Sequence, residues 1–155
     1  MHEYFLSKTI DLAVESLENG GGPFAAIVVD KDSNIIGTGT NGVTKNNDPT
    51  AHAEVLAIRD ACSKLEDFQL KDCILYTSCE PCPMCLGAIY WARVKKVYYA
   101  ADQQIAAMGG FDDAFIYDEI AKEHVNRKIP FQSISLENRS LPFEKWLEHE
   151  AKISY

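Results

Sequence analysis

Two short segments of the chain concentrate residue types that bind metals and move protons. The first is 52–54 (HAE) and the second is 81–85 (PCPMC). Cys82 and Cys85 are three positions apart, so both thiols project from one face of a first helical turn. Free N–H groups and the helix dipole at that position favour the thiolate, which is the form that zinc binds. We expect His52 to join the two cysteines as the third ligand of one zinc ion.

Three protein ligands leave one position of a tetrahedral zinc site open for water, as in catalytic zinc sites. Zinc lowers the pKa of its water to roughly 7, so that hydroxide forms at neutral pH. Glu54 follows His52 by two residues, and in a first helical turn its carboxylate can lie beside the metal without binding it. A carboxylate in that place can take a proton from the water and pass it to a substrate. The complete H-x-E…P-C-x-x-C pattern is typical of zinc-dependent nucleobase deaminases.

The same residues admit a structural alternative. Cys79 forms a second C-x-x-C with the first zinc cysteine, so His52 and three cysteines could close a site with no open position. Such a domain would bind a ligand or a partner without catalysis. The sequence favours the catalytic site because a closed site leaves Glu54 without a role. We expect Cys79 to be a packed thiol at a strand end, and Cys62 and Cys73 to be core residues.

The composition indicates one acidic globular domain. The 155 residues are 46% hydrophobic and 25% charged, with a net charge of −8, which excludes a disordered chain and disfavours a nucleic-acid partner. The longest stretches without Asp, Glu, Lys or Arg are 12 residues long, at 33–44 and 81–92, too short to cross a bilayer. The N-terminus has acidic residues throughout and no continuous apolar core, unlike a signal peptide. An odd number of cysteines, five, argues against a disulfide framework, and we expect a cytoplasmic protein.

Alternating helix and strand patterns must position the two motifs. Apolar runs predict strands over 24–29, 35–40, 73–76, 96–100 and 131–136, the first two joined as a hairpin. Helical periodicity predicts helices over 4–18, from 49 onward, and over 86–92, 112–122 and 143–152. Asp48 is expected to cap the second helix. The apolar stripe of the first helix contains Leu6, Ile10, Ala13, Val14 and Leu17. This order predicts a three-layer α/β/α fold with a five-stranded mixed sheet and helices on both faces.

Longer segments around the motifs resemble the small bacterial guanine deaminases, a branch of the cytidine deaminase-like fold. The resemblance covers nearly the whole chain. The zinc motif belongs to the whole superfamily, whereas Phe111-Asp112-Asp113 and the terminal Tyr155 narrow the resemblance to guanine. The matching segments are 22–24, 47–54, 77–93, 110–113, 115–117, 129–131 and Tyr155, and the match is weaker over 103–108 and 136–152.

The resemblance implies zinc-dependent hydrolytic deamination of guanine to xanthine and ammonia. Hydroxide would attack C2 of the purine, and Glu54 would shuttle protons between the water, ring N3 and the leaving amine. Asn41 and Asp113 would hydrogen-bond the purine, Asp113 would also be a catalytic residue beside Glu54, and Phe24 would stack on the purine. Backbone groups near Ala53 would contact the attacked atom. The ring of Trp91 is a further candidate substrate contact, with packing as the alternative.

The resemblance also implies a homodimer. In this family the C-terminal segment, here about 107–155, crosses to the partner subunit, and the small-residue stretch 106–110 is the plausible hinge. Tyr155 would then help to close the pocket of the neighbouring subunit. The expected partners are therefore a second copy of the chain and a small purine base, with neither nucleic acid nor membrane.

Two substrate alternatives stay open at this point. A tRNA adenosine deaminase shares the zinc motif, but the acidic charge of this chain argues against a tRNA partner. Guanosine or another amino-substituted ring, such as an aminotriazine, is a closer rival. A nucleoside deaminase must leave room for ribose beside N9, whereas a base deaminase can seal that edge with Tyr155.

Overall fold

The computed structural model describes all 155 residues and divides them into two compact units, Met1–Ala114 and Phe115–Tyr155. The first unit contains the only sheet of the chain and both zinc motifs. None of the helices is long and apolar enough to cross a lipid bilayer.

The sheet has four strands in the order β2-β1-β3-β4. Strands β1 and β2 form the predicted antiparallel hairpin, β1 pairs antiparallel with β3, and β3 pairs parallel with β4. The predicted mixed sheet is therefore confirmed for its first four strands. The parallel pair brings the carboxyl ends of β3 and β4 to the same edge. The bounds are β1 Ala25–Val29, β2 Ile35–Thr40, β3 Ile74–Cys79 and β4 Lys96–Ala101.

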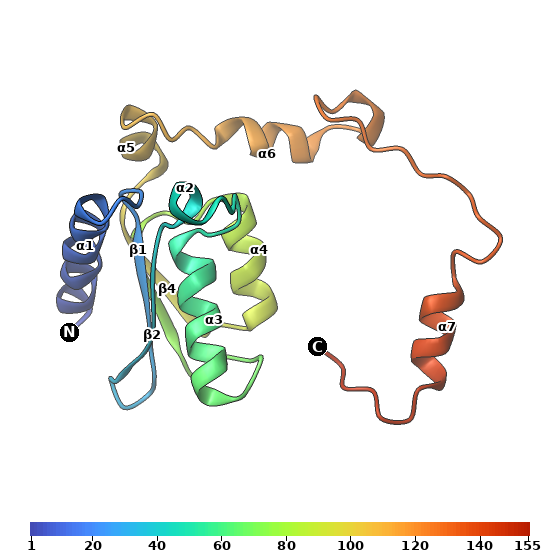
Figure 1. Cartoon of the computed structure of the whole chain (residues 1–155), viewed down its shortest axis with the longest axis horizontal. Helices are drawn as coiled ribbons and strands as arrows, with labels where there is room; N and C mark the ends of the chain where they lie inside the picture. The colour runs from blue at the N-terminus through green and yellow to red at the C-terminus, as the bar shows by residue number, and fades with distance from the viewer. The chain divides into compact units, whose positions relative to one another are not determined.

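Helices cover both faces of this sheet, which confirms the three layers. Helix α1 (His2–Glu18) packs on one face, and α3 (Ala53–Leu65) and α4 (Pro83–Ala92) pack on the other (Figure 1). Every residue of β1 is buried, because Ala26 and Val28 join the core under α3 and α4 while Ile27 and Val29 join the core under α1. Strand β1 therefore contributes to the hydrophobic cores on both faces of the sheet.

The apolar stripe predicted for α1 is only partly the buried face. Ile10, Val14 and Leu17 are 46%, 56% and 53% exposed. The buried residues of the helix are instead Phe5, Thr9, Ala13 and Ser16. Small side chains at three of these positions let the helix approach the sheet closely, and hydropathy alone ranks them below the larger aliphatic residues.

The helices that carry the motifs begin elsewhere than predicted. Helix α3 begins at Ala53 with His52 as its N-cap, four residues after the predicted start at Pro49. Asp48 caps a turn instead, since its Oδ1 accepts hydrogen bonds from the backbone N–H and the hydroxyl of Thr50. Helix α4 begins at Pro83, earlier than the predicted residue 86. Two short helices were not predicted, α2 (Val43–Asn46) and α5 (Gln103–Met108).

Helix α6 (Ala114–Ala121) begins at the last residue of the first unit, and the second unit contains the rest of it, the short 3-10 helix η1 (His124–Asn126) and α7 (Leu141–Glu148). The predicted helices at 112–122 and 143–152 correspond to α6 and α7. The predicted fifth strand at 131–136 is wrong, because these residues form no strand and the sheet has four. An apolar run becomes a strand only where a neighbouring strand completes its hydrogen bonds. No residue of the second unit is buried.

The contact between β2 and α3 depends on a glycine. A Cβ added at Gly39 would lie 2.1 Å from the carbonyl oxygen of Ala53 and 2.6 Å from the backbone nitrogen of Ala57. We expect Gly39→Ala to lower the free energy of unfolding by about 1–3 kcal/mol, since β2 or α3 must move apart. Urea denaturation measures this change.

Gly87 in α4 offers the matched control. A Cβ added there would have no neighbouring atom within 4 Å. Alanine inside a helix is more favourable than glycine by roughly 0.5–1 kcal/mol, so Gly87→Ala should not lower stability. Equal stability of the two variants would contradict the close approach of β2 and α3.

Candidate metal centre and active site

The three predicted zinc ligands meet where two helices begin. His52 is the N-cap of α3, and Cys82 and Cys85 are the N-cap and a first-turn residue of α4. The Nδ1 atom of His52 lies 3.5 Å from the Sγ atom of each cysteine, and all three ligand atoms lie within 4.8 Å of one another. A tetrahedral zinc with Zn–S and Zn–N bonds of roughly 2.3 and 2.0 Å separates S from N by about 3.5 Å. The residues present therefore fit a zinc ion.

The local sequence explains how the two cysteines converge. Strand β3 ends at Cys79, and Pro83 occupies the first turn of α4, where a missing backbone N–H costs nothing. The backbone N–H of Leu86 donates to the Cys82 carbonyl, 2.8 Å away, and closes the first turn. This turn directs both sulfur atoms toward His52.

The electrostatics of the cluster favour a negatively charged metal site. A hydrogen bond from the Cys85 thiol lowers the pKa of Cys82 to about 4, and His52 contributes in the same direction. The same hydrogen bond raises the pKa of Cys85, and the hydrogen bond to Cys82 raises the pKa of His52. Cys82 is thus the thiolate of the pair, and a bound metal would also favour the deprotonated form of Cys85.

Glu54 lies beside the cluster but outside it. It occupies the first turn of α3, is 6% exposed, and its Oε2 accepts from the Cys85 thiol at 3.5 Å. Burial raises the pKa of its carboxyl group, with smaller contributions from its neighbours. A buried carboxyl group with a raised pKa, next to the place where a metal-bound water would lie, is suited to accept and return a proton.

Thr77 is a contact of Glu54 that the sequence analysis missed. Its hydroxyl lies 3.4 Å from Oε1 of Glu54, and the side chain is buried in β3. No motif points to this threonine, because its position depends on the packing of α3 on β3. It contacts one carboxylate oxygen, Oε1, while the Cys85 thiol contacts the other, Oε2.

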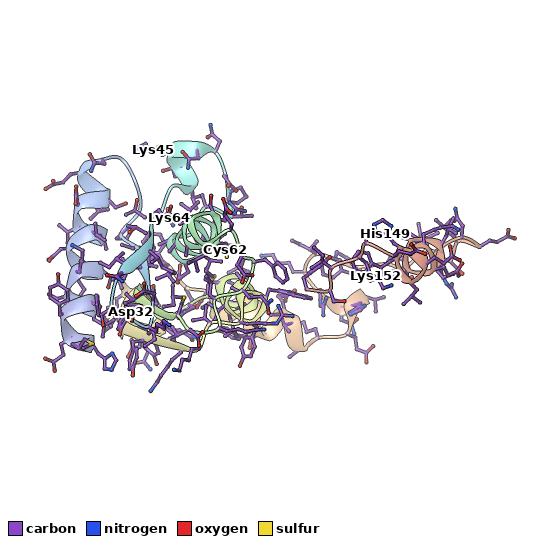
Figure 2. All side chains as sticks on the ribbon, turned by 90° about the horizontal axis from the view of Figure 1, so that it is seen from below. Asp32, Lys45, Cys62, Lys64, His149 and Lys152 are labelled. Atoms are coloured by element: carbon purple, nitrogen blue, oxygen red, sulfur yellow. The ribbon has the colours of Figure 1, made fainter.

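The structure does not support a fourth protein ligand. The metal-binding group contains His52, Cys82 and Cys85, and Cys79 is not part of it. Burial raises the pKa of Cys79 to about 11, so this thiol keeps its proton at neutral pH. Cys73 is buried and Cys62 packs against the same core on α3 (Figure 2). A zinc ion held by this cluster would therefore have three protein ligands and one position for water.

Asp113 lies near the metal cluster. Burial raises the pKa of its carboxyl group, and the charges of Cys82, Asp112 and Glu80 add to this effect. The Asp113 carboxylate therefore lies within electrostatic range of the Cys82 sulfur and of the Glu80 carboxylate. Glu80 is anchored by the backbone N–H of Gln103, which donates to its Oε2.

Three further candidates occupy the loops and helix ends of the first unit. The ring of Phe24 meets that of Phe111 edge-on, with centroids 4.9 Å apart. The Oδ1 atom of Asn41 accepts a hydrogen bond from the backbone N–H of Val43. Ala53, which stands in the sequence between the metal-ligand candidate His52 and the acid Glu54, is completely buried. The ring of Phe111, a residue of the Phe-Asp-Asp segment, therefore supports the predicted stacking residue Phe24.

Trp91 and Tyr155 are the two remaining candidates. Trp91 is near the end of α4, two turns beyond the cysteines, and is 65% exposed. Tyr155 belongs to the second unit. The substrate roles of both residues stay predictions.

The comparisons with known proteins agree with this site. Residues 1–101 match the model of the cytidine and deoxycytidylate deaminase zinc-binding region. The chain belongs to this family of zinc-binding deaminases, and the cluster His52, Cys82 and Cys85 could hold one metal ion.

Individual similar proteins have more narrowly defined activities than the family as a whole. Guanine deaminase of Bacillus subtilis is 57% identical over 155 residues, covering 99% of each chain, and its crystal structure matches with a TM-score of 0.98. A tRNA-specific adenosine deaminase of Aquifex aeolicus is 38% identical over 139 residues, which cover 89% of this chain and 88% of the relative. A solved structure in complex with 2,6-diaminopurine matches 73% of this chain and 63% of its own, with 37% identity and a TM-score of 0.70.

Proposed function

We propose that this protein hydrolyses guanine to xanthine and ammonia. The observation that carries the proposal is the 57% identity to a guanine deaminase along the whole chain, including the part beyond the family's zinc-binding region. The three-ligand cluster with a buried acid beside it supports hydrolysis, and the complex of a structural neighbour with 2,6-diaminopurine supports a purine. The tRNA-specific relative is less similar, and the net charge of −8 disfavours a tRNA substrate.

His52, Cys82 and Cys85 would hold the zinc ion, which supplies Lewis acidity that makes a water molecule acidic at neutral pH. Glu54 takes the proton of the attacking water and delivers it to ring N3, while a C2–O bond forms. Glu54 then moves the proton of the new C2 hydroxyl group to the amine, the C2–N bond breaks as the C2=O double bond of xanthine forms, and ammonia leaves. The burial of Glu54 keeps bulk water from competing for these protons.

The purine would be held by side chains around the cluster. Asp113 accepts from ring N–H groups, and Asn41 can donate and accept through its amide. Phe24 stacks on the ring, which is worth roughly 1–3 kcal/mol for a base on an aromatic side chain. Backbone groups at Ala53 contact the reacting carbon, and Trp91 is a candidate for the rim. These assignments rest on the resemblance and on the closeness of Asp113 to Cys82.

The decisive experiment follows the ultraviolet change when guanine becomes xanthine, with the purified, zinc-quantified protein. We expect guanine to be consumed while guanosine, adenine and cytosine are not. Asp113→Asn and Asn41→Ala should each lower kcat/KM by about tenfold to a hundredfold, the value of a lost hydrogen bond to substrate. A protein that carries zinc but leaves guanine intact would refute the proposed substrate and point to a nucleoside or another amino-substituted ring.

We further propose that the whole chain is one deaminase domain that works as a homodimer, with the segment from about 107 to 155 exchanged between subunits. The second unit supports this proposal because it buries none of its residues and exposes many apolar side chains, which normally mark an interaction surface. Among them are Phe115 (59% exposed), Ile129 (75%), Phe143 (70%), Leu147 (71%) and Tyr155 (72%).

Complementation tests the exchange. A Glu54→Gln chain and a chain that lacks Tyr155 should both be inactive alone. Produced together, they should recover activity, because one subunit then combines an intact Glu54 with the intact C-terminus of its partner. Dimers without recovery would contradict an exchange. We propose a cytoplasmic location on the ground that all five cysteines are free thiols.

A further inference from the structure

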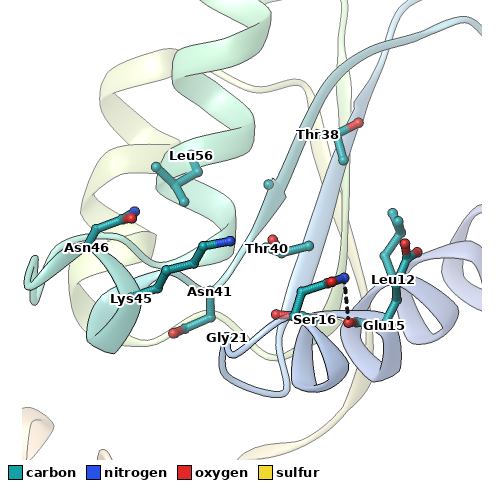
Figure 3. A pocket seen from close by; sticks show the side chains of 13 residues that line it. Leu12, Glu15, Ser16, Gly21, Thr38, Thr40, Asn41, Lys45, Asn46 and Leu56 are labelled. Atoms are coloured by element: carbon teal, nitrogen blue, oxygen red, sulfur yellow. Dashed lines mark hydrogen bonds between the residues drawn. The ribbon is translucent and has the colours of Figure 1, made fainter.

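The backbone of Asn41 is fixed from two sides. The residue follows the end of β2 and lies beside the turn that contains Gly21 (Figure 3). The N–H of Gly22 donates to the Asn41 carbonyl oxygen at 3.1 Å, and the N–H of Asn41 donates to the Phe24 carbonyl oxygen at 3.0 Å. Because these bonds hold the main chain, the side-chain torsions of Asn41 are what a small change nearby can alter.

The same loop is bonded to the residue that precedes the histidine of the metal cluster. The N–H of Gly42 donates to the carbonyl oxygen of Ala51 at 3.0 Å, and Ala51 stands directly before His52. Backbone hydrogen bonds therefore connect Asn41 and its neighbour both to the proposed stacking residue Phe24 and to the start of the metal cluster.

The carboxamide of Asn41 has one defined orientation. Its Oδ1 accepts from the backbone N–H of Val43 at 3.2 Å. A backbone N–H can only donate, so the atom that faces it must be the amide oxygen and not the amide nitrogen. The Nδ2 group has no protein acceptor in the structure. Asn41 therefore keeps the N–H donors of its amide for a bound molecule.

The missing side chain of Gly22 makes room for this orientation. The three atoms nearest to a Cβ added at Gly22 all belong to the Asn41 side chain, with Oδ1 at 2.8 Å, Cγ at 2.9 Å and Cβ at 3.2 Å. The φ angle of Gly22 is not positive, unlike those of Gly20 and Gly110, so alanine would not strain the backbone there. A methyl group at Gly22 would therefore act first on the carboxamide of Asn41.

We infer that Gly22 is a positioning residue for the reaction with guanine, because it lets the Asn41 carboxamide keep Oδ1 on Val43 and offer Nδ2 to the purine. This inference rests on the proposed function, which places Asn41 against the purine. Gly22 itself touches no substrate and acts through Asn41. Asn41 then donates to an acceptor of the ring, whereas the Asp113 carboxylate accepts from ring N–H groups. The two side chains thus recognise groups of opposite polarity.

A double-mutant cycle separates positioning from a general structural effect. Gly22→Ala should lower kcat/KM for guanine by about tenfold, as for a lost hydrogen bond to substrate. In a chain that carries Asn41→Ala, the same substitution should change kcat/KM by less than about twofold, because the carboxamide that it displaces is gone. Equal factors in the two backgrounds would overturn the inference. Gly87→Ala, whose added Cβ meets no atom within 4 Å, is the matched control and should keep kcat/KM.

Zinc content and stability provide the second readout. The atoms displaced in Gly22→Ala are the end of a flexible side chain and not backbone. The variant should therefore keep its zinc, and its melting temperature should fall by no more than about 4 °C. Loss of zinc or a larger fall would show a structural role of Gly22 and would overturn the inference.

Nuclear magnetic resonance of the isotope-labelled, zinc-loaded full chain gives a readout that does not depend on turnover. Gly22→Ala should shift the side-chain amide signals of Asn41 and speed hydrogen exchange at the Val43 N–H, which loses its acceptor. Asn41→Ala should speed the same exchange. Unchanged Asn41 signals in Gly22→Ala would overturn the inference. A parent protein that leaves guanine intact would refute the proposed function, and the amide signals would then decide whether Gly22 orients Asn41.

Discussion

Glu54→Gln is expected to reduce kcat for guanine by about 10²–10⁴-fold, the usual contribution of a general acid–base group. The amide keeps the size of the side chain and can still meet the Thr77 hydroxyl, but it cannot accept and return a proton. Because Glu54 is not one of the three ligand residues, the zinc content should stay at one ion per chain. Metal analysis and steady-state kinetics on the same sample separate the two effects.

The stability of this variant provides a second readout. Glu54 is 6% exposed, so replacing a buried ionisable group by a neutral one should not lower the melting temperature. Glu18→Gln, on the exposed surface of α1, is the matched control and should leave both kcat and zinc unchanged. If Glu54→Gln retained turnover within about tenfold of the parent, Glu54 would not be the proton carrier.

Cys82→Ser should remove both the metal and the activity. Cys82 carries the lowered pKa of the pair, and serine cannot supply a thiolate at neutral pH. With one of three protein ligands lost, zinc should be absent after purification and guanine hydrolysis should fall below detection. Metal analysis measures the first result, and the ultraviolet assay measures the second.

Cys79→Ser is the matched control for this substitution. Cys79 is the neighbouring thiol of the second C-x-x-C, yet it lies outside the metal group and keeps its proton. We expect this variant to retain zinc and turnover. Loss of zinc in Cys79→Ser would favour the closed four-ligand site and a role without catalysis. Removing zinc from the parent with a chelator should abolish activity, and added zinc should restore it.

The sequence by itself determined the features that depend on short-range spacing. The three-residue separation of Cys82 and Cys85 at the start of a helix, and His52 two residues before Glu54, predicted the metal group that the structure brings together. Alternating apolar runs predicted four strands and their hairpin, since strand and helix periods are local properties of the chain.

Only the tertiary structure decided features that depend on packing between distant residues. The run at 131–136 lacks a neighbouring strand, and α1 buries its small residues instead of its aliphatic stripe. Thr77 reaches Glu54, and the Ser16 hydroxyl is left unpaired, through the packing of helices on the sheet. Local sequence patterns predict which faces of a helix or strand are apolar enough to be buried. Which surface is buried, and which polar group loses water without gaining a partner, depends on the elements that pack against it.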